Sequence, residues 1–217
     1  MITTNIFSIS PTKKVAFSRG NLQYCPLSKI WKIAEKQYDV TGESNKYIGN
    51  TYGGFIDLFN WETAQRNPLG TDWRMPTTEE WHYLFYDREN ADSKYGLAQV
   101  AGVNGLIVLS DPFQLPSGLS FCCGAAFGFG SELFIKVNAY TAQEFSAMET
   151  QGAVFLPCGG YRYGYGVFRY SCGGYYWTST IREDNKVDFL SIQQCGVDIT
   201  DDYCQENCHS VRLIKDL

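Results

Sequence analysis

Few residues in this sequence combine the residue types and the spacing that catalysis requires. The chain has two histidines, His82 and His209, so a Ser-His-Asp or Cys-His arrangement would have to use one of them. Neither histidine lies in a nucleophile motif, and the sequence contains no G-x-S-x-G segment. We therefore interpret both histidines as surface or partly buried polar residues.

Carboxylates and thiols do not form a catalytic or metal-binding motif either. Asp198, Asp201 and Asp202 lie close together, but clustered Asp in a turn-rich segment usually marks a solvated loop. The sequence has no calcium loop of the D-x-D-x-D-G type, and Cys204 and Cys208 have no second pair at a zinc-binding spacing. We predict no catalytic residue, no metal site and no cofactor, while paired carboxylates for acid–base chemistry stay open.

The C-terminal sixty residues, 158–217, differ in composition from the rest of the chain. Tyr and Cys occupy twelve of these sixty positions, against eleven of the preceding 157. Tyr-rich and Gly-rich loops are typical of adaptable binding surfaces, because Tyr gives a large contact area at a small entropy cost. The eight cysteines of the chain include the adjacent pair Cys122 and Cys123, a spacing that argues against a disulfide framework.

Length and composition limit the class of protein. A chain of 217 residues with 44% hydrophobic and 19% charged residues predicts one globular domain. The 21 glycines and 16% aromatic residues favour short strands and turns. A net charge of −5 argues against a nucleic-acid partner, and no apolar run is long enough to insert into a membrane. The N-terminus lacks the pattern of a signal peptide.

Two capping boxes predict where helices begin. Thr77 with Glu80, and Thr141 with Glu144, follow the T-x-x-E pattern in which side chain and backbone cap each other, and Gly152 is a candidate C-cap. Alternating or apolar runs predict strands around Val15 and Phe17, after the turn at 20–21, and at 106–109, 153–156, 175–180, 187–192 and 210–214. Residues 193–208 are predicted as a loop, and the whole chain as a single α+β domain.

Four segments carry a resemblance to a known family: WRMPTTEEW at 73–81, GAVFLPCGGYR at 152–162, GGYYWTST at 173–180 and SVRLIK at 210–215. In this order they resemble the C-type-lectin-like domains of the formylglycine-generating-enzyme branch, especially the form found in gut Bacteroides and their phages. The resemblance covers nearly all of residues 1–217. It implies an α+β, C-type lectin-like fold, with two helices packed on small twisted antiparallel sheets and with long loops.

Within this branch, the chain looks similar to proteins that diversity-generating retroelements diversify. Their variable residues lie on a C-terminal ligand-binding surface and arise by changes at adenines, which produce Tyr, Cys, Phe, Ser, Asp, Gly and Arg. The resemblance places such a surface in residues 159–210, although Gln193 lies outside the simple codon set. The implied ligand-binding residues are Tyr163, Tyr165, Phe168, Tyr170, Ser171, Cys172, Arg182, Asp188, Phe189, Ser191, Gln193, Cys195, Asp198, Asp201, Tyr203 and Cys204.

Other residues of the same region match the scaffold of that family and are expected to be structural: Gly159, Gly160, Tyr161, Arg162, Tyr176, Trp177, Ser179, Val211, Arg212 and Leu213. In the strand expected at 187–192, alternation would place Leu190 and Ile192 inward, and Asp188 and Ser191 or their neighbours outward. We also expect the cysteines of the C-terminal region to be mostly free, exposed thiols, because unpaired surface Cys fits random codon change better than selected chemistry.

The resulting expectation is a non-enzymatic protein that binds a protein or glycan ligand on a cell surface, with a role in phage receptor binding as its specific form. Its place would be a virion or a cell surface, without nucleic-acid partners and without membrane insertion. One alternative is an ordinary, non-diversified cell-surface lectin-like domain of Bacteroides. Another is an oxidase of the formylglycine-generating type, for which Cys204 and Cys208 would be the thiol pair.

Overall fold

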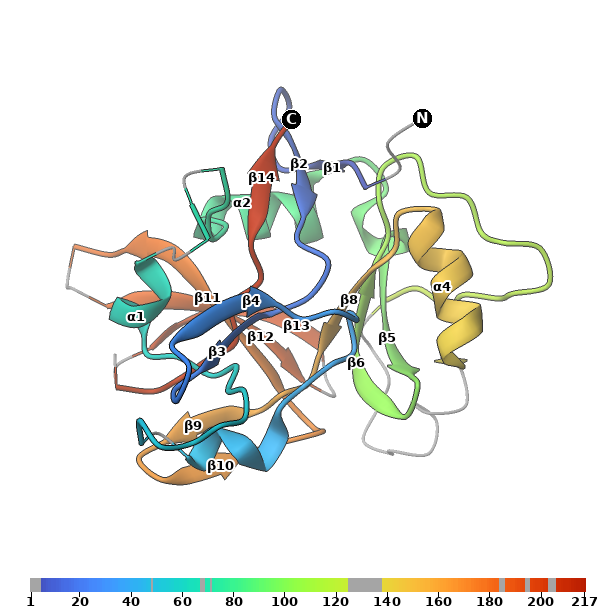
Figure 1. Ribbon diagram of the computed structural model, residues 1–217. Coiled ribbons are helices and arrows are strands. Elements are labelled where there is room, and N and C mark those ends of the chain that lie inside the picture. Colours follow the sequence, from blue (N-terminus) through green and yellow to red (C-terminus); the bar gives the residue numbers. More distant parts are fainter. Residues whose placement is uncertain are drawn as a thin grey trace.

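The structure consists mostly of β-strands: strands make up 37% of the chain and helices 17%, and the described residues form five small sheets (Figure 1). The computed structural model describes residues 5–47, 49–66, 69–70, 72–124, 138–183, 186–193, 196–202 and 206–217. The expectation of an α+β, C-type lectin-like fold with two helices packed on antiparallel sheets is wrong. Both expected helices form, with five and nine residues, but strands exceed helices more than twofold and are divided among five small sheets.

The largest sheet has four strands in the order β7-β5-β6-β8 and lies beside α4 (Figure 1). Strands β5 (Tyr95–Val100), β6 (Val103–Val108) and β8 (Val154–Pro157) pair antiparallel, while the short β7 (Ala139–Tyr140) runs parallel to β5. The strands expected at 106–109 and 153–156 are therefore confirmed. They are direct neighbours in space, with Leu106 opposite Leu156.

A three-stranded antiparallel sheet occupies the C-terminal region. It consists of β11 (Gly174–Ile181), β12 (Val187–Gln193) and β13 (Gly196–Asp202), paired in chain order. Strands β11 and β12 confirm the prediction. Strand β13 lies where a loop was expected. Val197 and Ile199 alternate with Asp198 and Thr200 and pack against the core, but this alternation covers only four residues before Asp201 and Asp202 end it.

The remaining seven strands form three small sheets. Two of them are pairs of strands that follow each other in the chain, β3-β4 and β9-β10, while the third, β1-β2-β14, joins the N-terminal to the C-terminal part of the chain. The two strands on either side of the turn at Gly20 belong to different sheets, because β2 pairs with β1 and β14 while β3 pairs with β4. At Gly20 a Cβ would lie 2.7 Å from the carbonyl oxygen of Ala34, so the close approach requires glycine. The strands are β1 (Phe7–Ser8), β2 (Lys14–Phe17), β3 (Leu22–Cys25), β4 (Ile30–Ile33), β9 (Tyr161–Tyr163), β10 (Gly166–Phe168) and β14 (Ile214–Asp216).

Both predicted capping boxes are present. Thr77 caps α2 (Thr78–His82), and its Oγ1 accepts a hydrogen bond from the backbone of Glu80 while the Glu80 carboxylate accepts one from the backbone of Thr77. Helix α2 continues into the π-helical turn η2 (Tyr83–Asp87). Thr141 and Glu144 cap α4 (Ala142–Thr150) in the same way. Gly152 follows α4 with φ +94°, the left-handed conformation expected after a helix.

Three shorter helical segments lie in the long connections. Asn60 caps α1 (Trp61–Gln65) by accepting a hydrogen bond from the backbone of Thr63. The 3₁₀ turns η1 (Gly42–Lys46) and η3 (Ala91–Ser93) lie before α1 and before β5. The long polar segment after β4 is therefore locally folded, which its composition did not reveal.

The core consists of three clusters of buried apolar side chains. One lies between α2, the four-stranded sheet and β12, and includes Trp81, Leu190 and Ile192. A second surrounds Trp177 on the opposite side of β11, and a third holds Phe145 of α4 against the four-stranded sheet. Two consecutive residues of β11, Tyr176 and Trp177, point to opposite faces of the strand. Tyr176 packs into the first cluster and Trp177 into the second, so β11 is held between them.

The final segment corrects one expectation. Val211 and Leu213 are buried as predicted, but Arg212 between them is equally buried, so the segment does not alternate between a core face and solvent. The strand begins only at Ile214. A continuous strand with one exposed face was the wrong interpretation, because this segment passes through the interior between two cores.

Candidate functional site

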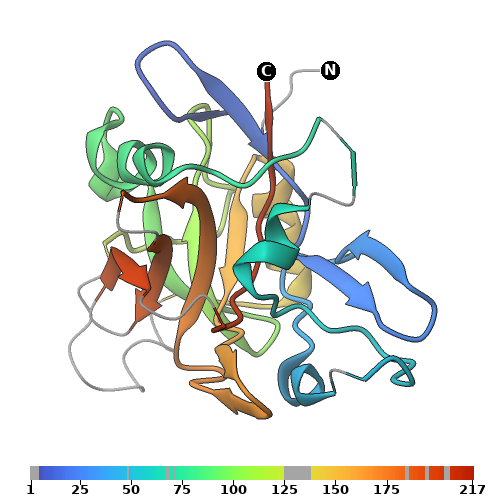
Figure 2. The ribbon, with the colours of Figure 1, turned by 90° about the vertical axis from the view of Figure 1, so that its left-hand side faces the viewer.

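The β9–β10 hairpin carries the densest group of exposed aromatic side chains in the described structure. The exposed fractions are 53% for Tyr163, 79% for Tyr165, 45% for Phe168 and 43% for Tyr170. Gly164 and Tyr165 form the loop of the hairpin, in which Gly166 is opposite Tyr163. Figure 2 shows the hairpin, in orange, projecting from the lower edge of the molecule. Three of the predicted ligand-binding residues therefore lie together on one protruding element, and Tyr170 lies in the turn directly after it.

The base of the hairpin is fixed by backbone hydrogen bonds to two neighbouring segments. Arg162 and Cys208 exchange two backbone bonds of 3.0 and 2.8 Å, and the Arg162 guanidinium donates to the Cys208 Sγ at 2.7 Å. Gly160 donates to the carbonyl oxygen of Gly173 at 2.9 Å. At Gly160, with φ +74°, a Cβ would lie 2.3 Å from the carbonyl oxygen of Phe168, so only glycine fits. The exposed rings are thus presented on a fixed support.

An aromatic stack lies behind the exposed side chains. Tyr161 stacks on Phe168 with ring centroids 5.5 Å apart and contacts Tyr175 edge-on at 5.3 Å. His209 stacks on Phe189 at 4.8 Å and is only 2% exposed. The stack connects the hairpin to the sheet β11-β12-β13. His209 therefore serves as a packed ring, more deeply buried than expected.

His82 lies away from the hairpin, at the C-terminal end of α2. Its Nδ1 is 2.9 Å from the Oδ2 of Asp87, and its side chain is largely exposed. The interpretation of His82 as a surface polar residue is confirmed.

The sheet behind the hairpin corrects the expected orientation of two site residues. Asp188 is 7% exposed and Ser191 is 3% exposed, so neither is a surface residue. Asp188 has the same parity as Leu190 and Ile192 and therefore points to the same buried face. There its carboxylate accepts a hydrogen bond of 2.7 Å from Thr78 of α2. Asp188 joins the sheet to a helix instead of facing a ligand.

Ser191 lies on the opposite side of the same strand, as alternation predicts, but neighbouring side chains cover it. It is opposite Tyr175 on β11 and Asp198 on β13, and its Oγ accepts a hydrogen bond of 2.9 Å from Gln193. Burial here follows from cross-strand neighbours that lie distant in sequence.

The structure divides the predicted ligand-binding residues by exposure. Phe189 and Gln193 are half-buried, and Asp201 lies in β13 opposite Asp188. Cys195, Tyr203 and Cys204 fall outside the described residues. The exposed members are Tyr163, Tyr165, Phe168, Tyr170, Ser171, Cys172, Arg182 and Asp198. All of these belong to the hairpin, to the turn after it or to the edges of the three-stranded sheet.

The cysteines of this region do not all behave as expected. Cys172 is a free, exposed thiol, whereas Cys158 is free but buried, and Cys208 is buried as well. The expectation of exposed thiols is therefore wrong for these two, because their positions face the interior beside the hairpin base. Burial raises the pKa of the Cys158 thiol to about 12, and the nearby Cys172 contributes in the same direction.

The charge of the hairpin differs in sign from that of the whole chain. Residues 158–182 contain Arg162, Arg169 and Arg182 but no Asp or Glu, whereas the chain has a net charge of −5. Arg169 lies in the turn after β10 with φ +54° and is exposed. The candidate site therefore combines aromatic rings with arginine, the two residue types most enriched in binding hot spots.

Sequence reasoning missed the aromatic residues that border the hairpin from the N-terminal half. The ring of Tyr170 packs on η1, where a Cβ at Gly42 would lie 3.0 Å from it. Immediately after η1, Tyr47 stacks on Tyr52 with centroids 4.8 Å apart. No local spacing could have joined these residues to the hairpin, because more than a hundred residues separate them in the chain.

Three comparisons with known proteins give no relative from which a role could be transferred. No protein-family model, curated protein or solved structure matches the chain. Within the described ranges, no three His, Cys, Asp or Glu side chains come together as metal ligands do. Each helix of the described chain is too short or too polar to traverse a bilayer.

Proposed function

We propose that this protein is a non-enzymatic ligand-binding protein that contacts its ligand through the β9–β10 hairpin and the adjoining edge of the three-stranded sheet. The observation that supports it is the exposure of Tyr163, Tyr165 and Phe168 on one anchored hairpin, with Tyr170 exposed in the turn after it. Large exposed aromatic groups in a contiguous patch are uncommon in proteins without a binding role. The ligand is a protein or a glycan on a cell surface.

The physics of the hairpin suits such a role. Tyr buries much area when bound and has few rotatable bonds to immobilise, so it binds at a low entropy cost. The backbone bonds of Arg162 and the stack behind the hairpin hold the rings before the ligand arrives. A fixed support reduces the ordering cost that association otherwise carries.

We also propose that a diversity-generating retroelement has diversified the exposed residues of this surface. Exposed hairpin positions can change without disturbing the core, whereas Gly160 and the backbone pair of Arg162 and Cys208 fix the base. The exposed residues also belong to the set that adenine-directed codon changes produce. Diversification would therefore act on the rings and leave the support intact.

No observation favours the oxidase alternative. Cys208 is buried under the guanidinium of Arg162, which donates to its Sγ, so a substrate thiol could reach it only after the hairpin had moved. Cys204 lies outside the described residues.

Probing the full chain against arrays of defined glycans and purified bacterial surface proteins tests the binding role. We expect at least one array member to bind, and the double variant Tyr163→Ala/Tyr165→Ala to bind it at least about tenfold more weakly. The matched control, Leu115→Ala/Leu217→Ala, removes exposed apolar groups elsewhere and should bind like the parent. Binding that the hairpin variant retains in full, or no binding on either array, would refute the proposal.

The origin of the surface has its own test. Sequencing the DNA beside the gene should reveal a near-copy of the codons for residues 159–210 that differs at adenines, next to a reverse transcriptase gene. An intact locus without these two elements would remove diversification from the proposal and leave the binding role standing.

A further inference from the structure

A pocket lies between α4 and the segment that follows β4. In Figure 1, α4 lies at the right of the molecule and the β9–β10 hairpin at its lower left. The volume of the pocket is about 180 Å³, below the roughly 300–1,000 Å³ that drug-sized ligands occupy. None of its lining residues belongs to the aromatic hairpin or the three-stranded sheet. The pocket therefore suits a compact small molecule and is independent of the proposed binding face.

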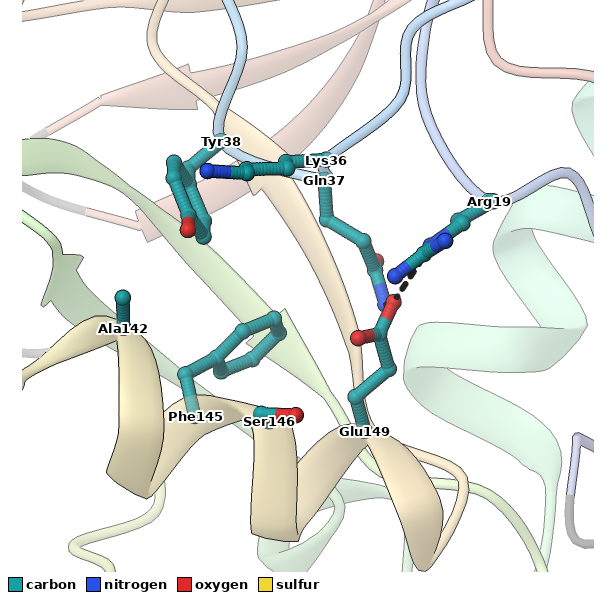
Figure 3. Close-up of a pocket in the computed structure, with 8 residues that line it drawn as sticks. All are labelled: Arg19, Lys36, Gln37, Tyr38, Ala142, Phe145, Ser146 and Glu149. Carbon is teal, nitrogen blue, oxygen red and sulfur yellow. Dashed lines mark hydrogen bonds and ion pairs between the residues drawn. The ribbon is translucent and has the colours of Figure 1, made fainter.

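One wall of this pocket is a single face of α4. Ala142, Phe145, Ser146 and Glu149 follow the i, i+3, i+4, i+7 spacing that places side chains on one side of a helix. The ring of Phe145 is held from behind by Phe155, with centroids 5.8 Å apart. The Phe145 ring lies on the pocket side of α4 in Figure 3, but only 1% of the residue is exposed, so it forms the closed floor of the pocket. This wall is apolar at its centre and has the carboxylate of Glu149 at its end.

Two hydrogen bonds, one of them part-buried and one exposed, position the carboxylate of Glu149. Its Oε1 accepts from the side-chain amide of Gln37 at 3.1 Å and from the Nε of Arg19 at 3.4 Å. Gln37 is itself buried and also donates to the carbonyl oxygen of Ala153 at 3.0 Å. Both of these hydrogen bonds, from the described residues, end on Oε1, and the second oxygen points toward Phe145 in Figure 3. That oxygen is placed to accept a bond from a ligand ammonium group.

Arg19 supplies the opposite charge beside it. Only its Nε contacts Glu149, so the two terminal nitrogens of the guanidinium remain available to a ligand carboxylate. An arginine fork binds a carboxylate through two parallel hydrogen bonds. A carboxylate and an arginine side by side match the adjacent ammonium and carboxylate groups of a free α-amino acid.

The far end of the pocket indicates which side chain the ligand carries. Lys36 extends its Nζ over the ring of Tyr38, 5.7 Å from the centroid, and forms no ion pair within the described chain. Arg19 and Lys36 against Glu149 give the lining one net positive charge. We infer that this pocket binds a free α-amino acid with an acidic side chain, whose methylene groups lie beside Tyr38 on the floor formed by Phe145 and whose side-chain carboxylate meets Lys36.

Calorimetric titration of the full chain with L-glutamate tests this site. We expect saturable binding, and at least about tenfold weaker binding of glutarate, which lacks the ammonium group, and of γ-aminobutyrate, which lacks the α-carboxylate. L-lysine should also bind more weakly, because its side chain repels Lys36. No binding of L-glutamate at low millimolar concentration, or equal binding of glutarate, would overturn the inference.

Two pairs of variants locate the binding. Ser146→Leu fills the pocket from an exposed helix position and should abolish the heat of binding, while Ala147→Leu, one residue further along α4, should leave it unchanged. Glu149→Gln keeps the acceptor for Gln37 but removes the charge, and should weaken binding at least about tenfold. Glu62→Gln makes the same charge change on α1 and should have no effect. If Ser146→Leu binds L-glutamate like the parent, the site lies elsewhere and the assignment is wrong.

Discussion

The guanidinium of Arg212 donates a hydrogen bond of 2.6 Å to the backbone carbonyl oxygen of Phe155, inside the protein. It also donates to the carbonyl oxygens of Ser18 and Arg19, both at 3.1 Å, and to the side chain of Asn21 at 3.0 Å. One side chain thus joins the last segment of the chain to β8 and to the turn between β2 and β3. Burial lowers the pKa of this guanidinium to about 10.

Replacing this arginine should be costly. Arg212→Met would leave several buried carbonyl oxygens without a donor, so we expect the free energy of unfolding to fall by about 2–5 kcal/mol. Arg66→Met is the control, because Arg66 forms an exposed ion pair with Glu62 that is worth less than about 1 kcal/mol. Chemical denaturation of both variants measures the difference. Equal effects would mean that the Arg212 bonds do not stabilise the fold.

Local signals in the sequence predicted local structure well. The T-x-x-E patterns at Thr77 and Thr141 specify where α2 and α4 begin, since each capping box needs only four consecutive residues. The apolar runs of β6, β8, β11 and β12 were equally readable. Such elements depend on neighbours in the chain, so one sequence contains enough information to find them.

Long-range relationships could not be predicted from the same signals. The burial of Ser191 depends on its neighbours on β11 and β13, and that of Arg212 on three distant carbonyl groups. The position of Asp188 was predictable, because parity with Leu190 places it on the inner face. The hairpin was found by its composition, whereas the pocket at α4 depends on Arg19 and Gln37, which no motif connects to that helix.

The N-terminal cap of α4 should contribute measurably to stability. Thr141→Ala removes the oxygen that accepts from the backbone of Glu144 at 3.2 Å, and we expect a loss of about 1 kcal/mol in the free energy of unfolding. Thr12→Ala is a suitable control, because the Thr12 side chain is exposed and caps no helix. Urea denaturation of the two variants would show the cap effect as a lower midpoint at an unchanged slope. Equal midpoints would contradict it.

The thiols of the C-terminal region should react according to burial. Treating the folded protein with iodoacetamide should label Cys172 first, and Cys158 at least about tenfold more slowly, because the buried Cys158 requires local opening. Peptide mass mapping over time measures each rate. Denaturant should remove the difference. A disulfide-linked peptide that contains Cys158 or Cys172 before treatment would contradict the assignment of these two as free thiols.

Alkaline pH should destabilise the protein through Cys158. Its pKa is raised from 9.0 to about 12 by burial, so above pH 9 the thiol ionises in the unfolded chain while the folded state keeps it neutral. The stability contribution is fully present below pH 9 and is lost as pH rises toward 12, by at most about 1.4 kcal/mol per pH unit. Denaturation of parent and Cys158→Ala between pH 8 and about pH 10 tests this. The variant should show the shallower pH dependence; identical slopes would exclude the thiol as the cause.

The hairpin should tolerate changes that the sheet beneath it does not. Tyr163→Ser and Tyr165→Ser alter mostly exposed rings, so each should change the free energy of unfolding by no more than about 0.5 kcal/mol. Asp188→Ser removes the buried acceptor of Thr78 and should cost about 1–3 kcal/mol. Both kinds of residue were predicted as variable from their type alone, and the structure separates them by exposure. Thermal unfolding of the three variants measures these changes in stability. An equal loss of stability in all three would mean that the exposed rings also support the fold. Residues that support the fold could not form a surface that diversifies.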